Sequence, residues 1–436
     1  MKTRIRPRNI GIISLGCSKN LVDSEKLARQ IQSGNIRIIF DPPSIKGFDT
    51  AIINTCGFIA DAKQESVDTI LQFAEARKRG VISRLIVMGC LSERYRQSLK
   101  EEIPEIDGLF GVGEIKQILN ELGLDYKKEL LGERFMSTPA HYAYLKIAEG
   151  CSRRCSFCAI PLIRGPHKSR PAVEIISEAK SLVASGVREI NLISQDTTYY
   201  GLDRYHERRL PDLADHLAQI QGLEWIRIHY TYPDGFPLRL LDSMNRNRNI
   251  CRYIDIPLQH ISSRILRSMK RNISREKTEK LIETIRNRVP GIAIRTTFIV
   301  GYPGETEAEF RELMDFVKAS RFDRVGVFIY SHEEDTPAYQ LRDNLPVTIK
   351  SERAGELMQL QESVSFSLNT KKIGSTLRVL VDQVDDENII ARSEFDSPEV
   401  DNEIHIDRKS ARVKPGEFRM VRVTGAENFD LYAELI

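Results

Sequence analysis

Short runs of apolar and β-branched residues alternate with amphipathic, helix-like stretches along the N-terminal part of the chain. The predicted strands, each with the helix that follows it, are 9–15 with 24–33, 50–55 with 66–79, and 84–88 with 93–102. Alternation of this kind is typical of βαβ units, in which helices cover a parallel sheet. The pattern therefore predicts an open parallel α/β sheet domain at 8–125, followed by a weakly patterned linker at 126–139.

A second alternating series follows the linker. Its predicted strands are 141–148, 189–194, 225–230, 253–257, 293–300 and 324–330. Helical patterns follow at 173–184, 213–220, 238–245, 264–286, 305–319 and, at the end of the series, 349–368. Six strand–helix units are too few for an eightfold barrel, so we expect a partial (β/α)6 barrel within a domain at 137–366.

The C-terminal residues have a different pattern. Short alternating runs at 377–381, 389–392, 403–406 and 419–423 are separated by turn-forming sequences such as Lys414-Pro415-Gly416. Several short strands at this spacing predict a small antiparallel β-barrel at 367–436.

Composition narrows the class of protein. The 436 residues are 41% hydrophobic and 29% charged, with a net charge of +3, which fits two or three globular domains and excludes wholesale disorder. A balance near zero also excludes a strongly basic nucleic-acid binder, although local basic patches remain possible. The longest apolar runs, Ile10–Cys17 and Leu85–Leu91, are about half the ~20 residues that a membrane-spanning helix needs. The first apolar stretch is also short for a signal peptide, so we expect a cytoplasmic protein without a membrane partner.

The chain has seven cysteines, an odd number that does not suggest a disulfide framework. Three of them form the motif Cys151-x3-Cys155-x2-Cys158, just after the first predicted barrel strand. One interpretation is a zinc knuckle completed by His167, because structural zinc needs four ligands. Iron–sulfur clusters normally take four cysteines, and this motif offers three. The other interpretation is therefore a cluster with one iron left open for a small molecule.

Three further cysteines share a placement. Cys17, Cys56 and Cys90 each follow a predicted strand of the N-terminal domain. Ligands of open parallel sheets gather at the carboxyl ends of strands, so these thiols can converge despite their separation in sequence. The alternative is that they are ordinary thiols at buried strand ends. Cys251 belongs to neither group, and we interpret it as a core thiol.

The C-x3-C-x2-C motif, with aromatic Phe157 before its last cysteine at the mouth of a partial barrel, resembles the radical S-adenosylmethionine superfamily. Together, the two cysteine triads resemble the methylthiotransferase family within it, over essentially the whole chain. This resemblance implies two 4Fe–4S clusters, one on Cys17, Cys56 and Cys90 and a catalytic one on Cys151, Cys155 and Cys158. It also implies S-adenosyl-L-methionine as a cofactor and a C-terminal TRAM barrel.

Several stretches resemble the branch of this family that modifies a ribosomal protein: Ser14–Glu25, Ile193–Gly201, Pro257–His260 and Thr297–Glu305. One departure is Ser18, a loop residue where that branch usually has proline. The resemblance implies a methylthio transfer to the β-carbon of an aspartate in small-subunit ribosomal protein S12. It further implies an electron donor such as flavodoxin or ferredoxin, and a monomer. The alternatives are a tRNA adenosine methylthiotransferase and a zinc-containing RNA-binding module.

Cofactor contacts are predicted less sharply than the cluster ligands. The expected residues lie in the motif or near the ends of predicted barrel strands: Phe157, Ser194, Gln195, Arg295 and Gly301. A solvated strand end explains Ser194 and Gln195 without any cofactor, and a strand-to-helix turn explains Gly301 equally well.

Charge is distributed unevenly between the domains. Residues 367–436 contain ten Lys and Arg against fourteen Asp and Glu, a net charge of −4, which leaves +7 for the rest of the chain. A barrel that grips tRNA is expected to carry surplus positive charge. An acidic C-terminal barrel instead favours a basic protein as the substrate.

Overall fold

The computed structural model describes residues 9–408 and 412–436. Contacts divide it into two compact units, which are described separately. The first unit contains the described residues up to 138, together with 144–153 and 158–181, and the second contains 139–143, 154–157 and 182–436. Residue 8, the first of the predicted N-terminal domain, lies outside the described residues, as does the rest of the N-terminal segment before it. The three-domain boundaries stay a prediction.

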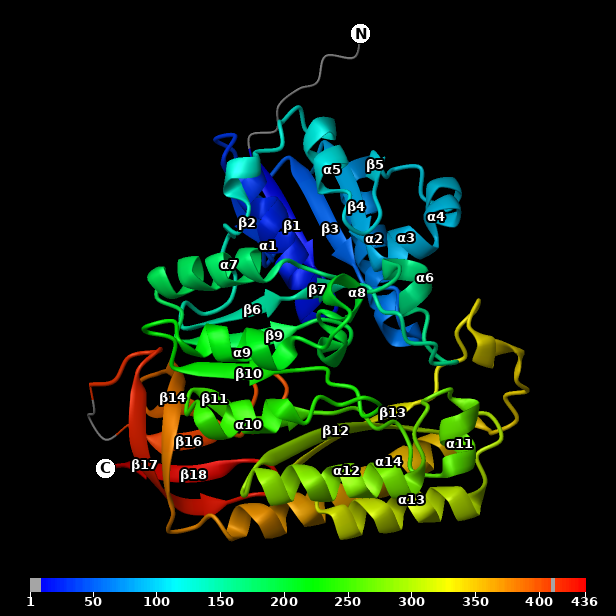
Figure 1. The fold of residues 1–436 in the computed structure, drawn as a ribbon. Helices are drawn as coiled ribbons and strands as arrows, with labels where there is room; N and C mark the ends of the chain where they lie inside the picture. Colours follow the sequence, from blue (N-terminus) through cyan, green and yellow to red (C-terminus); the bar gives the residue numbers. More distant parts are fainter. Residues whose placement is uncertain (1–8, 409–411) are drawn as a thin grey trace. The chain divides into compact units, whose positions relative to one another are not determined.

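The first unit is built on a five-stranded parallel sheet in the order β2-β1-β3-β4-β5, drawn in blue and cyan in Figure 1. Its strands are β1 (Asn9–Ser14), β2 (Arg37–Phe40), β3 (Thr50–Thr55), β4 (Arg84–Gly89) and β5 (Gly108–Leu109). Its helices are α1 (Ser18–Gln32), α2 (Ala60–Lys78), α3 (Cys90–Arg94), α4 (Arg96–Glu102) and α5 (Ile115–Glu121), and η1 (Lys128–Leu130) follows them. The short elements β7 (Ala148–Glu149), α6 (Ile160–Arg164) and β8 (Lys168–Ser169) also belong to this unit.

Alternation along the strands divides the core of this sheet into two layers. Ile52 of β3 and Ile86 of β4 pack against α1 and α5 on one face, through residues such as Leu27 and Ile118. The alternate positions of the same strands face α2, α3 and α4. Because every second side chain points to the same face, strands covered by helices on both sides appear in sequence as continuous apolar runs.

The second unit contains most of a six-stranded sheet in the order β13-β12-β11-β10-β9-β6, of which β6 has only its first two residues in this unit. The strands are β6 (Tyr142–Lys146), β9 (Glu189–Ile193), β10 (Trp225–Ile228), β11 (Ile250–Asp255), β12 (Ala293–Val300) and β13 (Arg324–Ile329). The helices of this unit are α8 (Leu202–Tyr205), α9 (Leu210–Ala218), α10 (Arg239–Arg246), α11 (Ser263–Ser268), α12 (Arg275–Arg288), α13 (Glu307–Ser320) and α14 (Val347–Thr370), with η2 (Thr197–Tyr199) and η3 (Pro337–Gln340). Helix α7 (Ala172–Ala184) has only its last three residues in this unit. Strands β9 to β13 pair in parallel, as predicted for the partial barrel.

The C-terminal residues form a closed barrel in the order β14-β15-β16-β18-β17, orange to red in Figure 1. Its strands are β14 (Thr376–Val384), β15 (Asn388–Ser393), β16 (Ile404–Asp407), β17 (Phe418–Ala426) and β18 (Leu431–Leu435). All neighbouring pairs are antiparallel except β16 with β18, which is parallel. The predicted fold class, an α/β protein with a small C-terminal barrel, is confirmed.

Within the described ranges, no helix combines the length and the apolar character that crossing a bilayer demands.

Candidate functional site

The structure brings Cys17, Cys56 and Cys90 to one edge of the first sheet. Cys17 immediately precedes α1, Cys56 directly follows β3, and Cys90 is the first residue of α3, directly after β4. Strands β1, β3 and β4 are parallel neighbours, so their carboxyl ends lie side by side. Gly16, beside Cys17, approaches Cys56 so closely that a Cβ atom on the glycine would lie 3.1 Å from the Cys56 Sγ atom.

Burial and neighbouring charges act differently on the three thiols. Burial raises the pKa of Cys90 to about 11 and also raises the pKa of Cys56, and the charge of an ionised Cys17 adds to both shifts. Cys17 keeps an exposed face and behaves differently. Desolvation by the surrounding chain opposes its ionisation, but the charges of Lys19 and Arg164 outweigh that effect and lower its pKa. Because the thiolate is the form that binds metals, the cationic surroundings favour metal binding here.

A buried arginine that the sequence interpretation missed lies at this site. Arg164, the last residue of α6, has a side chain that is 2% exposed and donates to the Oδ1 atom of Asn20 at 2.5 Å. Its positive charge also acts on the Cys90 thiol and lowers the pKa of that thiol against the effect of burial. No sequence signal marks this role, because Arg164 lies 144 positions from Asn20. Asn20 could have been identified from the sequence, since it lies three residues after Cys17 within the first turn of α1.

The donor set of this site fits an iron–sulfur cluster. Cysteine thiolates are the ordinary ligands of such clusters, and the charges of Lys19 and Arg164 favour the thiolate form of Cys17. Three cysteines with cationic neighbours therefore fit an iron–sulfur cluster.

The second triad is divided between the two units. Cys151 and Cys158 belong to the first unit, where the Cys151 amide donates to Gly165 O at 3.0 Å. Cys155 belongs to the second unit, and its role as a ligand together with the other two stays a prediction. The proposed zinc ligand His167 is buried and its Nε2 atom lies 3.2 Å from the Ser169 hydroxyl, so that nitrogen already has a partner.

Two further residues missed from the sequence contact Cys155 within the second unit. The Tyr232 hydroxyl and the Arg271 Nη1 atom each lie 3.5 Å from its Sγ atom. The Arg271 guanidinium stacks on the Tyr232 ring, 4.1 Å from its centroid. Cys155 therefore lies against a buried cation and a phenol hydroxyl.

Three of the predicted cofactor residues, Ser194, Gln195 and Gly301, lie at carboxyl ends of strands in the central sheet. Ser194 directly follows β9 and is fully buried, and its hydroxyl has no hydrogen-bond partner within the described part of the chain. Gln195 follows it and is half-buried. Gly301 follows β12 with a φ of +74°, and its amide donates to the Glu305 carboxylate at 2.9 Å. An unpartnered buried hydroxyl beside an open strand end fits a polar ligand group.

The other two predicted cofactor residues, Phe157 and Arg295, contact side chains of the protein itself. Phe157 packs in an apolar cluster with Met269 and Tyr302. Arg295 is the third residue of β12 and lies near its beginning, where its guanidinium pairs with Asp255 and Asp401 at 3.2 Å each. These pairs give Arg295 a structural role, and its contact with a cofactor stays a prediction.

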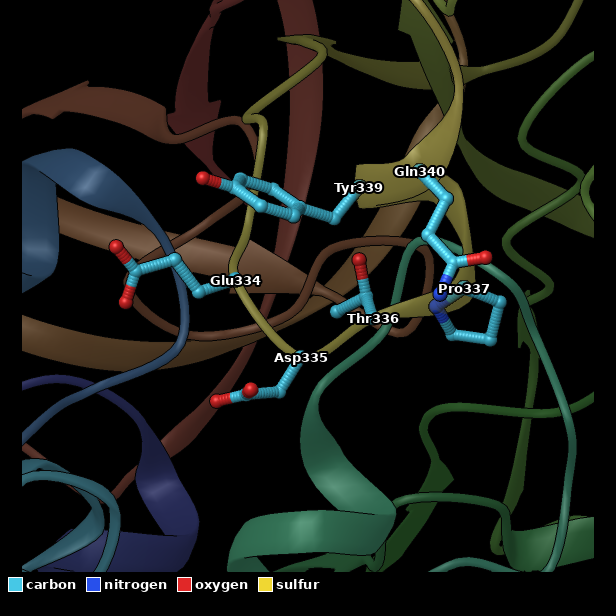
Figure 2. A pocket seen from close by; sticks show the side chains of 6 residues that line it. All are labelled: Glu334, Asp335, Thr336, Pro337, Tyr339 and Gln340. Carbon is cyan, nitrogen blue, oxygen red and sulfur yellow. The ribbon is translucent and has the colours of Figure 1, made fainter.

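A separate hollow of about 540 Å³ opens in the segment between β13 and α14. Figure 2 shows the six residues that line it: Glu334, Asp335, Thr336, Pro337, Tyr339 and Gln340. None of the predicted cofactor residues is among them, so this hollow is distinct from the strand ends that carry Ser194 and Gly301.

Comparison with family models divides the chain into three matched regions. Residues 9–111 match the uncharacterized protein family UPF0004, residues 145–317 match the radical SAM superfamily, and residues 373–436 match the TRAM domain.

Curated relatives match along the whole chain. The ribosomal protein uS12 methylthiotransferase RimO of Flavobacterium johnsoniae is 50% identical over 435 residues, covering 100% of both chains. The protein of the same name from Porphyromonas gingivalis is 51% identical, covering 99% of this chain and 100% of the relative.

Solved structures share the fold at low identity. The radical S-adenosylmethionine methyltransferase TsrM from Kitasatospora setae, with cobalamin and a [4Fe-4S] cluster bound, is 15% identical with a TM-score of 0.58. This similarity covers 76% of this chain and 74% of that one. The cobalamin-dependent S-adenosylmethionine radical enzyme OxsB is 13% identical with a TM-score of 0.51, covering 81% and 56%.

Proposed function

The chain belongs to the RimO family of methylthiotransferases, and from this premise we propose that it adds a methylthio group to the β-carbon of an aspartate in ribosomal protein uS12. The observation that carries the proposal is about 50% identity, along the full length, to curated uS12 methylthiotransferases. The acidic C-terminal residues 367–436, with a net charge of −4, suit a basic ribosomal protein as substrate better than tRNA.

The reaction demands cofactors because no side chain can perform it. The β C–H bond of aspartate is not acidic enough for any protein base to remove its proton at neutral pH. Iron–sulfur clusters together with S-adenosyl-L-methionine would supply the radical that takes this hydrogen, and the sulfur and methyl group that replace it.

The residues of the chain have separate tasks in this proposal. Cys17, Cys56 and Cys90 hold one 4Fe–4S cluster, and the nearby charges of Lys19 and Arg164 favour the thiolate form of Cys17. Cys151, Cys155 and Cys158 hold the second, catalytic cluster. The polar groups at the carboxyl ends of β9 and β12, including the buried Ser194 hydroxyl and the backbone of Gly301, bind and orient S-adenosyl-L-methionine.

The compartment in which the protein acts and its redox partner follow from the same chemistry. We expect a monomer that acts in the cytoplasm, where the ribosome is assembled. An electron donor of the flavodoxin or ferredoxin class would supply the electron that the catalytic cluster needs.

The substrate is tested by comparing the substrates of the two branches of the family in separate reactions. The anaerobically reconstituted protein is incubated with S-adenosyl-L-methionine and a reductant, and either with uS12 or with unmodified tRNA. Mass spectrometry of both products is expected to find one methylthio group on a uS12 aspartate and none on tRNA. Modification of tRNA alone would assign the chain to the tRNA branch.

Metal analysis tests the chemistry independently of substrate. About eight irons per chain, with matching sulfide, are expected for two four-iron clusters. One or two zinc ions with little iron would instead indicate the zinc-containing RNA-binding module.

A further inference from the structure

Arg164 occupies a central place in the buried polar network beside Cys17, Cys56 and Cys90. Besides its bond to Asn20, its Nη1 atom lies 2.8 Å from Glu149 Oε1 and 3.4 Å from Asp23 Oδ2. All of these residues belong to the first unit. A guanidinium with several fixed partners keeps a defined position, because its planar donors match several acceptors at once.

Asn20 connects the three strand ends that carry the cysteines. Its Nδ2 atom donates to Leu15 O at 2.9 Å and to Thr55 O at 3.0 Å, the carbonyls that precede the Gly16-Cys17 pair and Cys56. Its Oδ1 atom accepts from the Cys90 thiol at 3.7 Å as well as from Arg164. One fully buried side chain therefore fixes the spacing of all three cysteine-bearing segments.

The charges of this network balance only when Arg164 is present. Lys146 pairs with Glu149 at 2.7 Å and also with Asp23, so two cations face two carboxylates. Arg164 is the member that also donates to the Asn20 Oδ1 atom, which accepts from the Cys90 thiol. Replacing it with a neutral residue would leave two carboxylates against one ammonium close to the thiols.

We propose that Arg164 and Asn20 are positioning residues of the Cys17–Cys56–Cys90 site, with Asn20 setting the spacing of the ligands and Arg164 providing the charge that stabilises the reduced state of a bound cluster. The inference rests on the proposed function in one respect, that these three thiols hold an iron–sulfur cluster. Reduction adds a negative charge to the cluster, so a nearby fixed cation raises the reduction potential. Partners outside the ligand set commonly orient and tune metal ligands in this way.

The test of Arg164 isolates this cluster in the full-length chain. In a background with Cys151, Cys155 and Cys158 replaced by alanine, anaerobic reconstitution is followed by iron analysis and by a redox titration monitored by electron paramagnetic resonance. Arg164→Gln is expected to shift the reduction equilibrium at least tenfold toward the oxidised state, which is about 59 mV for one electron. Arg164→Lys, which keeps the charge, should show a smaller shift in the same direction.

The matched control is Arg134→Gln. Arg134 is an equally buried arginine of the same unit, paired with Glu25 at 3.4 Å and Glu178 at 3.5 Å. The Arg134→Gln variant should leave the reduction potential of the cluster unchanged. Loss of the cluster in Arg164→Gln, with the cluster kept in Arg164→Lys and Arg134→Gln, would also support the proposal. A parental potential in Arg164→Gln, or an equal shift in Arg134→Gln, would overturn it.

Asn20 is tested by the rate at which a chelator removes iron from the same background. Asn20→Ala is expected to accelerate the loss at least tenfold, because the three segments are no longer tied together. Asn9→Ala is the control, since Asn9 also donates to a backbone carbonyl, Gly47 O at 2.9 Å, but at the opposite end of β1. Equal rates in the two variants would refute the role of Asn20. If the alanine background binds no iron at all, the proposed function of this triad fails, and the inference fails with it.

Discussion

Replacing Glu189 is expected to lower the free energy of unfolding of the second unit strongly. This carboxylate, at the start of β9, has a fully buried side chain and accepts from Arg227 Nε and Arg392 Nη2, both at 2.9 Å. Arg392 comes from β15 of the C-terminal barrel, so Glu189 links that barrel to the central sheet. Burial opposes ionisation of Glu189, but the two arginines outweigh it and lower its pKa. The carboxylate is therefore charged under ordinary conditions.

The expected cost of Glu189→Ala is about 4 kcal/mol. Hydrogen bonds to charged groups contribute roughly 1.5–3 kcal/mol each, and breaking a buried ion pair typically costs about 3–5 kcal/mol. The variant loses two such bonds and leaves two guanidinium groups facing each other. Glu189→Gln keeps one acceptor oxygen and should lose about half as much, ~2 kcal/mol.

Urea denaturation followed by tryptophan fluorescence measures this cost directly. Trp225 is the single tryptophan of the chain and contacts Phe418 of β17 edge-on, at 4.9 Å between ring centroids. The matched control is Glu224→Ala, which removes an exposed pair with Arg378 at 2.7 Å and should cost less than about 1 kcal/mol. If Glu189→Ala and Glu224→Ala lowered the free energy of unfolding equally, the role assigned to the buried link would be wrong.

Three further outcomes are expected. Gly301→Ala should destabilise the chain by roughly 1–3 kcal/mol in urea denaturation, because its φ is +74° and a Cβ atom would collide with the Lys350 side chain; no loss would refute this. Burial lowers the pKa of His229 despite its neighbour Asp255, so below about pH 6.5 the unfolded chain binds a proton that the folded chain does not. The free energy of unfolding should therefore fall as the pH decreases from 7 to 5, and His229→Asn should flatten that slope. Ser194→Ala should weaken S-adenosyl-L-methionine binding by roughly tenfold in calorimetry, if the buried hydroxyl pairs with the cofactor, and unchanged affinity would exclude that contact.

The sequence predicted the elements whose apolar pattern is strong. Strands β3 and β12 have the predicted bounds, because buried parallel strands leave continuous apolar runs. The edge strand β2 (Arg37–Phe40) was missed, since it is short and none of its residues is fully buried. The predicted helix 264–286 is two helices, because Lys270 and Asn272 adopt positive φ values of 55° and 54° between them.

The candidate site was predictable to the extent that it depends on strand ends. Parallel strands bring their carboxyl ends together, so Cys17, Cys56 and Cys90 could be grouped from sequence alone. Arg164 could not, because its contacts arise from packing between segments far apart in the chain. Arg295 was expected near a strand end, but it is the third residue of β12 and pairs with Asp401, 106 residues away, a partner that the sequence does not reveal. Its contact with a cofactor stays a prediction.

The central claim is that two cysteine triads have separate tasks in one methylthiotransferase. The most direct measurement quantifies 5′-deoxyadenosine and methylthiolated uS12 in the same reactions, for the parent, Cys17→Ala and Cys151→Ala. The account predicts that Cys17→Ala still cleaves S-adenosyl-L-methionine but makes no methylthiolated protein, and that Cys151→Ala makes neither product. Full methylthiolation by Cys17→Ala would contradict it.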